Sequence, residues 1–273
     1  MVNGTLAEMR RRGAHLHFWI AMMLAIALSL FVTFNISNAS ADSPTTVVVH
    51  SGDANWSTAD TRSGGSVAFV AGPTGAPLGT GSLQLNTTEG SDANQAKAQL
   101  FNTSYVGTHI SDLTTLSYSE YHSSSSTAAY PAQHASINIE ITDPDLGFTT
   151  LVYEPYEQAG FSPTDDTWTP WNTLDGVWWS THALPGHSNK FDTTPWSTIL
   201  ADYPNATITG GIGLNVGSGW HGLANNNVDA LAIGVNGATT VYDFEPTPAP
   251  PTNNVVMSAL DSSGNPLSGV AIT

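Results

Sequence analysis

Short runs of β-forming residues, separated by turn residues, recur along most of this chain. Leu116–Tyr121 and Ile137–Ile141 alternate apolar and polar side chains, a pattern that packs one face of a strand inward and leaves the other face exposed. The further runs cover residues 47–49, 67–70, 82–85, 148–153, 177–179, 211–216, 228–235 and 239–244. Their spacing, with Gly, Pro, Asn or Asp between them, predicts an all-β fold: an antiparallel β-sandwich of about ten strands.

One short helix is expected near residue 200. Pro195 suits the first helical position, Thr193 or Thr194 can cap the helix, and Pro204 ends it. Its apolar stripe consists of Trp196, Ile199 and Leu200. A helix this short is not stable alone, so we expect it to pack against an edge or an end of the sandwich.

The chain contains no cysteine. Secreted domains that are too small for a hydrophobic core usually depend on disulfides, and this chain has none to use. The stretch from Asp42 to Glu245, about 200 residues, is long enough to bury a core. We therefore expect one β-sandwich domain over residues 42–245, stabilised by burial.

The first 41 residues indicate export. Arg10–Arg12 form a basic start, Phe18–Phe34 is an apolar run, and Ala39-Ser40-Ala41 offers small residues to a signal peptidase. The alternative is a retained membrane anchor, but the run is shorter than a typical span of about 20 residues. We predict a signal peptide over residues 1–41 and a secreted or cell-surface protein, with no membrane insertion after cleavage. An exported chain without cysteine fits a bacterial source best.

Charge excludes one class of partner. Without residues 1–41, the chain keeps 3 of its 6 Lys and Arg residues and 21 of its 22 Asp and Glu residues, a formal net charge of −18. The three cations are Arg62, Lys97 and Lys190. Such a surface repels phosphate backbones, so we expect no nucleic-acid partner. It suits cations and neutral ligands such as sugars, or it merely keeps a secreted protein soluble.

The domain is followed by a change in composition. Residues 246–254 are rich in Pro and predict a stiff linker. Residues 255–273 have the pattern of a strand, a turn and a strand, which is too short for a core. The stretch Leu260–Val270, with Asp261-Ser262-Ser263-Gly264-Asn265-Pro266 as its turn, resembles the first hairpin of bacterial Ig-like surface repeats and of carboxypeptidase-regulatory-like domains. We interpret it as the truncated start of an Ig-like β-domain, in a chain that is a fragment of a multidomain protein or a truncated gene product.

The last third of the main domain carries a second resemblance. Gly211–Val216, Asn227–Gly234 and the closing Tyr242–Pro246 resemble exported bacterial jelly-roll modules of the concanavalin-like lectin/glucanase or galactose-binding-like type. The resemblance implies a jelly-roll-like sandwich and is compatible with sugar binding. It does not imply catalysis.

Tryptophans supply the candidate ligand-binding residues. Trp168, Trp171, Trp178 and Trp179 cluster in residues 168–179, and Trp220 follows downstream. Exposed indole faces stack on the apolar faces of sugar rings. Trp178 and Trp179 are adjacent on a strand and point to opposite faces, so at most one faces a ligand. We predict Trp171, Trp220 and Trp168 as the ligand-binding residues; the alternative is that most of these rings pack in the core or clamp a loop.

Carboxylates near a glycine turn suggest structural calcium. Asp143 and Asp145 precede Gly147, and with Asp229 they are the predicted calcium ligands. The further ligands of an EF-type loop are absent at the required spacing. The alternative is a polar β-turn in which Pro144 fixes the first central position.

No catalytic residue is predicted. Sandwich glucanases carry Glu-X-Asp-X-X-Glu on one strand, and the nearest stretch, Glu140–Asp145, has Thr142 for the central Asp and Asp145 for the last Glu. Ser218 lies near His221, but without the geometry of a nucleophile elbow. His182, His187 and His221 also lack metal-ligand spacing.

These observations favour a non-catalytic extracellular module that binds a polysaccharide or other glycan or acts in adhesion. Two alternatives stay open: a structural spacer domain with no ligand, and an atypical polysaccharide-degrading enzyme. Three or more carboxylates that converge in one groove would favour the enzyme.

Overall fold

The structure is a computed structural model that describes residues 43–88, 95–127, 133–182, 192–219, 222–249 and 259–268. The chain divides into two units, Met1–Ala41 and Asp42–Thr273, and the described residues belong to the second. The predicted signal peptide and Trp220 lie outside the described residues.

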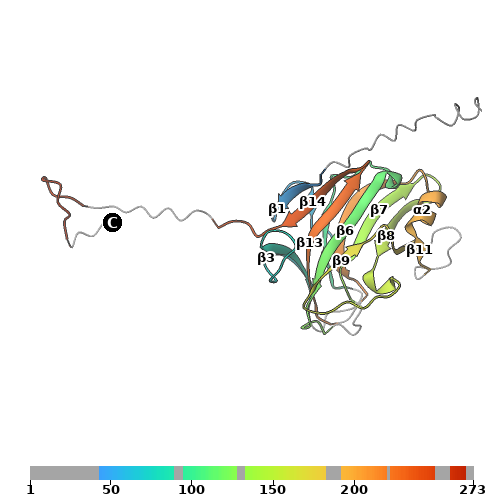
Figure 1. The fold of residues 1–273 in the computed structure, drawn as a ribbon, viewed down its shortest axis with the longest axis horizontal. Helices are drawn as coiled ribbons and strands as arrows, with labels where there is room; N and C mark the ends of the chain where they lie inside the picture. Colours follow the sequence, from blue (N-terminus) through green and yellow to red (C-terminus); the bar gives the residue numbers. More distant parts are fainter. Residues whose placement is uncertain are drawn as a thin grey trace, which may run out of the picture. The chain divides into compact units, whose positions relative to one another are not determined.

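Sheet A has seven strands in the described part of the chain. Its strands are β1 (Thr45–Val49), β14 (Ala238–Phe244), β13 (Ala224–Val235), β4 (Gly81–Thr87), β3 (Gly65–Ala71), β6 (Leu113–His122) and β9 (Trp168–Asn172). The long β13 is its centre: β6 pairs along one side, and β4 and then β14 pair along the other. Figure 1 shows β14, β13, β6 and β9 side by side.

Sheet B also has seven strands among the described residues. In spatial order they are β11 (Thr194–Pro195), β10 (Val177–Ser180), β8 (Gly147–Tyr153), β7 (Ser136–Asp143), β12 (Thr207–Gly217), β5 (Lys97–Asn102) and β2 (Trp56–Ser57). Every pairing between them is antiparallel. Two 3₁₀ turns, η1 (Ile110–Asp112) and η2 (Pro155–Glu157), lie in the connections.

Side-chain alternation builds the core between the sheets. Ile137, Ile139 and Ile141 on β7 are fully buried, and so are Leu83 and Leu85 on β4. All five belong to one hydrophobic cluster, to which both sheets contribute side chains. The structure therefore confirms the all-β, antiparallel jelly-roll-like β-sandwich, with α2 (Trp196–Asp202) as the one α-helix in the described residues. No helix in that part of the chain is both long enough and apolar enough to span a membrane.

The helix differs from the prediction at its start. Pro195 precedes the helix instead of opening it, and no side chain caps the helix. Thr194 pairs with Trp178 in the β10–β11 ladder, which removes it as a cap. Trp196 and Ile199 are buried, as the predicted apolar stripe requires.

All ten predicted runs are strands, and four more join them: β2, β5, β9 and β11. β9 contains Pro170, but it pairs only with β6 and is an edge strand, where proline is tolerated. One pairing is not antiparallel, because β1 runs parallel to β14.

Part of the predicted C-terminal hairpin is described. Leu260 bridges Pro266, and the Asp261 carboxylate accepts the backbone N–H groups of Ser263 and Asn265 at 2.8 and 2.9 Å. These bonds lower the pKa of Asp261. Residues 250–258 and 269–273 lie outside the described residues, so the linker and the Ig-like start stay predictions.

Candidate functional site

The outer face of sheet B forms a groove with a volume of about 300 Å³. On β7, the isoleucines point into the core, so Ser136, Asn138 and Glu140 point outward into this groove. The same alternation turns outward residues of β5, β8, β10 and β12 toward it. We call it the sheet B groove; its described lining residues are Asp60, Arg62, Lys97, Gln99, Phe101, Ser136, Asn138, Glu140, Phe148, Thr150, Val152, Glu154, Trp179, Thr181, Asn215, Gly217 and Ser218.

One row of paired residues crosses the floor of the groove. Trp179 pairs with Val152, Val152 with Asn138, Asn138 with Gly213, and Gly213 with Phe101. A Cβ on Gly213 would lie 2.3 Å from the Phe101 ring, so only glycine lets this ring lie against the sheet. The row therefore places an aromatic ring toward each side of a central amide.

Glu154 holds the Trp179 side chain in position. The Trp179 indole N–H donates to Glu154 Oε2 at 2.7 Å, and the Tyr156 hydroxyl donates to the same oxygen at 2.9 Å. Burial raises the pKa of Tyr156, and the nearby Glu154 carboxylate raises it further. The phenol therefore keeps its proton and its role as donor.

Glu140 is the carboxylate left without a hydrogen-bond partner among the described groove residues. Its side chain lies against Gly210, where an added Cβ would meet Glu140 Oε2 at 1.6 Å. Burial raises the pKa of Glu140, Lys97 opposes this rise, and Asp60 adds to it. Glu140 thus combines access to the groove with a weakened acidity.

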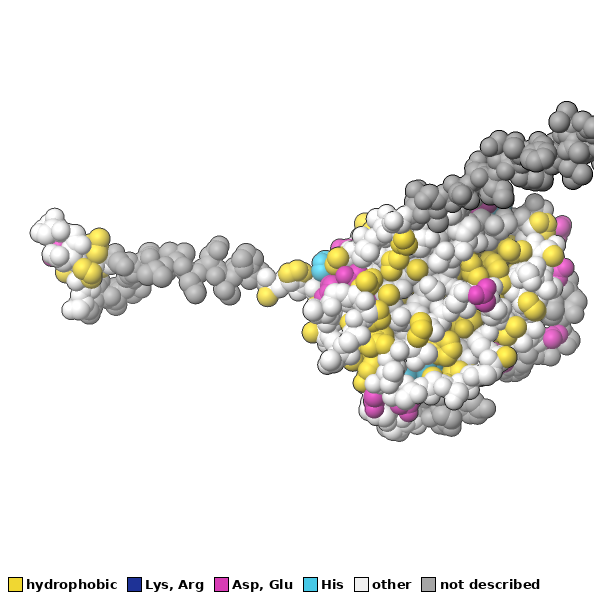
Figure 2. Space-filling model, in the orientation of Figure 1, with side chains coloured by type: hydrophobic (Ala, Val, Ile, Leu, Met, Phe, Trp, Pro, Cys, Tyr) yellow, Lys and Arg dark blue, Asp and Glu magenta, His cyan; other side chains and the backbone are white. Residues whose placement is uncertain are grey.

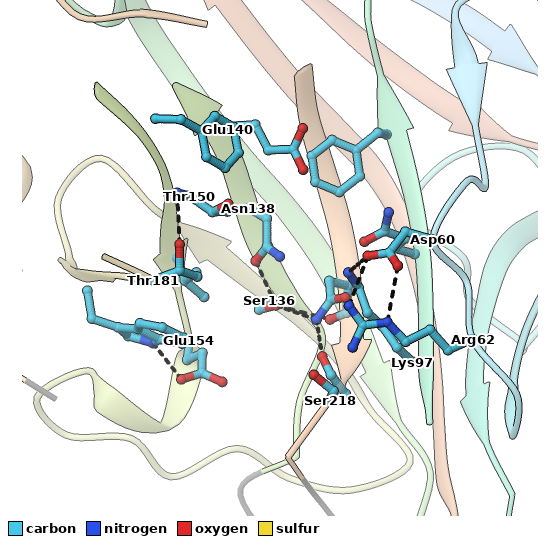
Figure 3. Close-up of a pocket in the computed structure, with 17 residues that line it drawn as sticks. Asp60, Arg62, Lys97, Ser136, Asn138, Glu140, Thr150, Glu154, Thr181 and Ser218 are labelled. Atoms are coloured by element: carbon cyan, nitrogen blue, oxygen red, sulfur yellow. Dashed lines mark hydrogen bonds and ion pairs between the residues drawn. The ribbon is translucent and has the colours of Figure 1, made fainter. Parts of the chain in front are cut away.

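Three charged side chains form one side of the groove, opposite Glu154 (Figure 3). Asp60 accepts Arg62 Nε at 3.1 Å, Arg62 Nη2 at 3.2 Å and Lys97 Nζ at 2.5 Å. These bonds to Arg62 and Lys97 lower the pKa of Asp60. We call Asp60, Arg62 and Lys97 the charged triad; two cations on one carboxylate give it a net charge of +1.

The groove floor also holds an unsatisfied acceptor. Asn215 is 7% exposed, its Nδ2 donates to the Gly217 carbonyl and toward Ser136 Oγ, and its Oδ1 is buried without a hydrogen bond in the described structure. Ser136 in turn donates to Asn138 Oδ1 at 3.2 Å. A buried amide oxygen without a partner is costly unless a ligand or water donates to it.

Two of the three predicted tryptophans lie elsewhere. Trp168 and Trp171 are half-buried on β9 of sheet A, and Trp168 packs edge-on against Tyr121. Trp171 borders a hollow of about 510 Å³ on the outer face of sheet A, but its indole N–H donates inward to Glu120 at 3.1 Å. The structure thus gives Trp171 a structural contact, and it places neither Trp168 nor Trp171 in the sheet B groove.

Glu120 is the centre of a buried polar network. Glu120 is 1% exposed and accepts His134 Nδ1 at 2.8 Å and the Ala135 N–H at 2.5 Å, besides the Trp171 indole. His134 stacks on His122 with ring centroids 4.3 Å apart, and His122 Nδ1 lies 2.8 Å from Asp165 Oδ1. The carboxylate is fully engaged inside the fold.

The three predicted calcium ligands do not form one site. Asp143 Oδ1 accepts the backbone N–H groups of Asp145 and Leu146 in the β7–β8 turn, as the polar-turn alternative predicts. Asp229 lies on β13 in the other sheet, where its carboxylate accepts the Leu78 and Phe244 N–H groups. Nowhere in the described residues do three His, Asp or Glu side chains meet in a way that could hold a metal ion. Calcium binding itself stays a prediction, which unfolding in EDTA or calcium at matched ionic strength will test.

Sequence reasoning missed most of the groove. It did predict that only one of Trp178 and Trp179 faces outward: Trp178 is fully buried, and Trp179 lines the groove. The alternation along residues 137–141 also contained Asn138 and Glu140. Asp60, Arg62 and Lys97 carried no local signal, because the fold brings a loop and β5 together.

Comparison with known proteins adds no family: no protein-family model and no curated protein matches this chain. The functional argument therefore depends on the geometry of the groove.

Proposed function

We propose that this domain is a secreted or cell-surface module that binds a glycan in the sheet B groove. The observation that carries this proposal is the row from Trp179 through Asn138 to Phe101. Aromatic rings offer flat apolar surfaces to the C–H faces of sugars, and amides bond their hydroxyls. Small-molecule sites combine apolar walls with a few fixed polar groups in this way.

The support has two further parts. The groove volume of about 300 Å³ is at the small end of ligand sites, which suits one or two sugar units of a longer chain. The Trp179 ring is pre-positioned by its bond to Glu154, so little side-chain entropy is lost when a ligand stacks on it. Export rests on the N-terminal sequence pattern.

The test is binding to a glycan array, followed by calorimetry on the best ligand. We expect Trp179→Ala to weaken binding about tenfold, equivalent to about 1.4 kcal/mol, because a stacking surface is lost. Trp168→Ala is the matched control, since it removes a predicted ligand-binding tryptophan that lies half-buried on β9 of sheet A, outside the groove. If Trp168→Ala loses binding and Trp179→Ala does not, the ligand is not in the sheet B groove. If no glycan binds, the structural-spacer alternative replaces the proposal.

A second candidate function is polysaccharide cleavage. One observation favours it: three carboxylates, Asp60, Glu140 and Glu154, line the same groove, and Glu140 has a raised pKa. A general acid needs a pKa closer to the working pH than an ordinary glutamate has. Against it, Glu154 is bonded to Trp179 and Asp60 to two cations, which leaves one unengaged carboxylate where glycosidases use two.

Glu140→Gln separates the two functions. An enzyme would release new reducing ends from a bound polysaccharide, and this release would fall at least a hundredfold in the variant while binding persisted. A binding module releases none in either form.

A further inference from the structure

The few cations of this chain are not scattered. Only three remain after residue 41, and two of them, Arg62 and Lys97, line the sheet B groove. They lie on the same side, because Arg62 and Lys97 form a bridge between their backbones. The chain after residue 41, with a formal net charge of −18, therefore places two of its three cations in this groove.

The bond pattern of Arg62 leaves one recognition edge open. A guanidinium offers two edges that each suit a carboxylate, one at Nε and Nη2 and one at Nη1 and Nη2. Asp60 occupies the first edge, at 3.1 and 3.2 Å. The Nη1 donors have no hydrogen bond within the described structure, and the Arg62 side chain is 40% exposed. Asp60 thus fixes the plane of Arg62 while the outer edge stays free.

Lys97 adds charge to the same point. Its side chain is 14% exposed, and its Nζ spends one of three donors on Asp60. Among the described residues, Asp60 is the one carboxylate in direct contact with this ammonium and guanidinium, and Glu140 acts on Lys97 only across the groove. The buried Asn215 Oδ1, also in the groove, has no hydrogen bond in the described structure and can accept one from a hydroxyl or an N–H group. An acid sugar offers both complements, a carboxylate and hydroxyls.

We propose that Arg62 and Lys97 form a subsite for the carboxylate of a uronic-acid residue, so that the groove binds an acidic glycan. The inference rests on the proposed function and names its ligand class. The uronate carboxylate meets the open edge of Arg62, and a neighbouring sugar unit lies toward Trp179. The overall negative charge repels a long polyanion, so the subsite selects short or sparsely charged stretches.

The experiment compares tetragalacturonate with its carboxyl-reduced counterpart by calorimetry on the protein. We expect the acidic form to bind at least tenfold more tightly. Arg62→Gln should weaken tetragalacturonate about tenfold or more and leave the reduced form unchanged, and Lys97→Met should act in the same direction. Lys190→Met is the control for net charge, because it removes the one other Lys or Arg that the sequence has after residue 41. Arg62→Lys keeps the charge without the two-donor edge and should lie between wild type and Arg62→Gln.

Each outcome decides the question. Equal affinity for the two oligosaccharides, or an equal loss for both in Arg62→Gln, overturns the inference while glycan binding stands. If the protein binds neither oligosaccharide and no glycan on the array, the proposed function is overturned as well. A sulfated oligosaccharide is the third ligand. If it binds as tightly as tetragalacturonate, the subsite recognises negative charge in general and not a carboxylate in particular. Thermal midpoints establish that each variant is folded, and Arg62→Lys carries the test if Arg62→Gln is not.

Discussion

The two sheets differ in where the carboxylates of their strands point. Sheet A buries them: Glu120 on β6 and Asp229 on β13 are 1% and 0% exposed. Sheet B carries Glu140 of β7 on its outer face, in the groove, and its buried Asp143 lies at the very end of β7, where it accepts N–H groups of the β7–β8 turn. Figure 2 shows the molecule over β13, β6 and β9, where white and yellow atoms predominate and no Lys or Arg of the described residues is visible.

This contrast separates structural from functional charge. A ligand cannot reach a fully buried carboxylate, and such a group stabilises the fold only while all of its hydrogen-bond partners remain. An outward carboxylate in a groove costs less and stays available. The hollow on sheet A, by comparison, has no charged side chain among its described lining residues, and its one amide side chain is Asn172. The sheet B groove therefore offers a ligand more charged and polar groups than the sheet A hollow, although the sheet A hollow is larger.

The largest expected effect concerns Glu120. Glu120→Ala leaves the Ala135 N–H, the Trp171 indole and His134 without their buried acceptor. We expect the free energy of unfolding to fall by about 3–5 kcal/mol. Urea unfolding measures it, with Glu140→Ala on sheet B as the matched control, expected within about 0.5 kcal/mol of wild type. Similar losses at both positions would break the contrast between the sheets.

Asp229 adds a pH dependence to the stability of the fold. Burial raises the pKa of Asp229 to about 6, against the bonds from Ala230, Leu78 and Phe244 that lower it. Because the folded state holds this proton more tightly than the unfolded state, the contribution of Asp229 is most favourable below about pH 4. It is lost as pH rises through about 6, by at most about 3 kcal/mol. We expect the thermal midpoint to fall between pH 4 and pH 7.

Asp229→Asn isolates this group from the general self-repulsion of the acidic chain. The variant loses one hydrogen bond from a backbone N–H group, because an Asn side chain accepts through one oxygen only. It is less stable overall, but its midpoint should vary less over the same pH range. An unchanged pH profile would assign the effect to the net charge instead.

The indole N–H groups of Trp171 and Trp179 allow a direct comparison of the two sheets, with a smaller expected effect on stability. Trp171 donates to the buried Glu120, and Trp179 donates to Glu154 at the groove. Phenylalanine keeps a ring in both places and removes the N–H. We expect Trp171→Phe to cost about 1.5–3 kcal/mol of stability and Trp179→Phe less than about 1 kcal/mol. Urea midpoints measure both; a reversed order would mean that Trp179 belongs to the structural network.

Sequence patterns predicted the sandwich well because its signals are local. The alternation in Ile137–Ile141 requires one apolar face, and turn residues bound each strand, so ten runs were found as strands. β5 was missed because its alternation of polar and apolar residues covers only Lys97–Leu100; Phe101 then places an apolar ring on the groove face. The groove depends on which strands become neighbours, and no local pattern encodes that order.

The same limit explains the choice of tryptophans. Trp171 was predicted to bind a ligand, but β9 pairs with β6 and brings the Trp171 indole to Glu120. Arg62 and Lys97 lie 35 positions apart in the numbering and meet only through a bridge. The adjacency of Trp178 and Trp179 was informative because opposite orientations on a strand need no tertiary information.

The smallest expected effect concerns Glu140 and the pH dependence of binding. Burial raises the pKa of Glu140, and the other charged groups lining the groove are Asp60, Arg62, Lys97 and Glu154. An ionised Glu140 repels a uronate, so a carboxylated ligand favours the protonated form. Affinity for tetragalacturonate should therefore rise as pH falls from 7 toward 5. A screened repulsion over several ångströms corresponds to about a two- to threefold change.

Glu140→Gln removes this charge at every pH. The variant should bind tetragalacturonate two- to threefold more tightly than wild type at pH 7, and its affinity should change less between pH 7 and pH 5. Asp60 contributes little in this range, because the bonds from Arg62 and Lys97 lower its pKa and keep it ionised. The carboxyl-reduced oligosaccharide is the control, since a neutral ligand does not respond to the charge of Glu140. Calorimetry at both pH values measures the difference. Weaker binding in Glu140→Gln would mean that the Glu140 carboxylate accepts hydrogen bonds from sugar hydroxyls and does not repel a uronate.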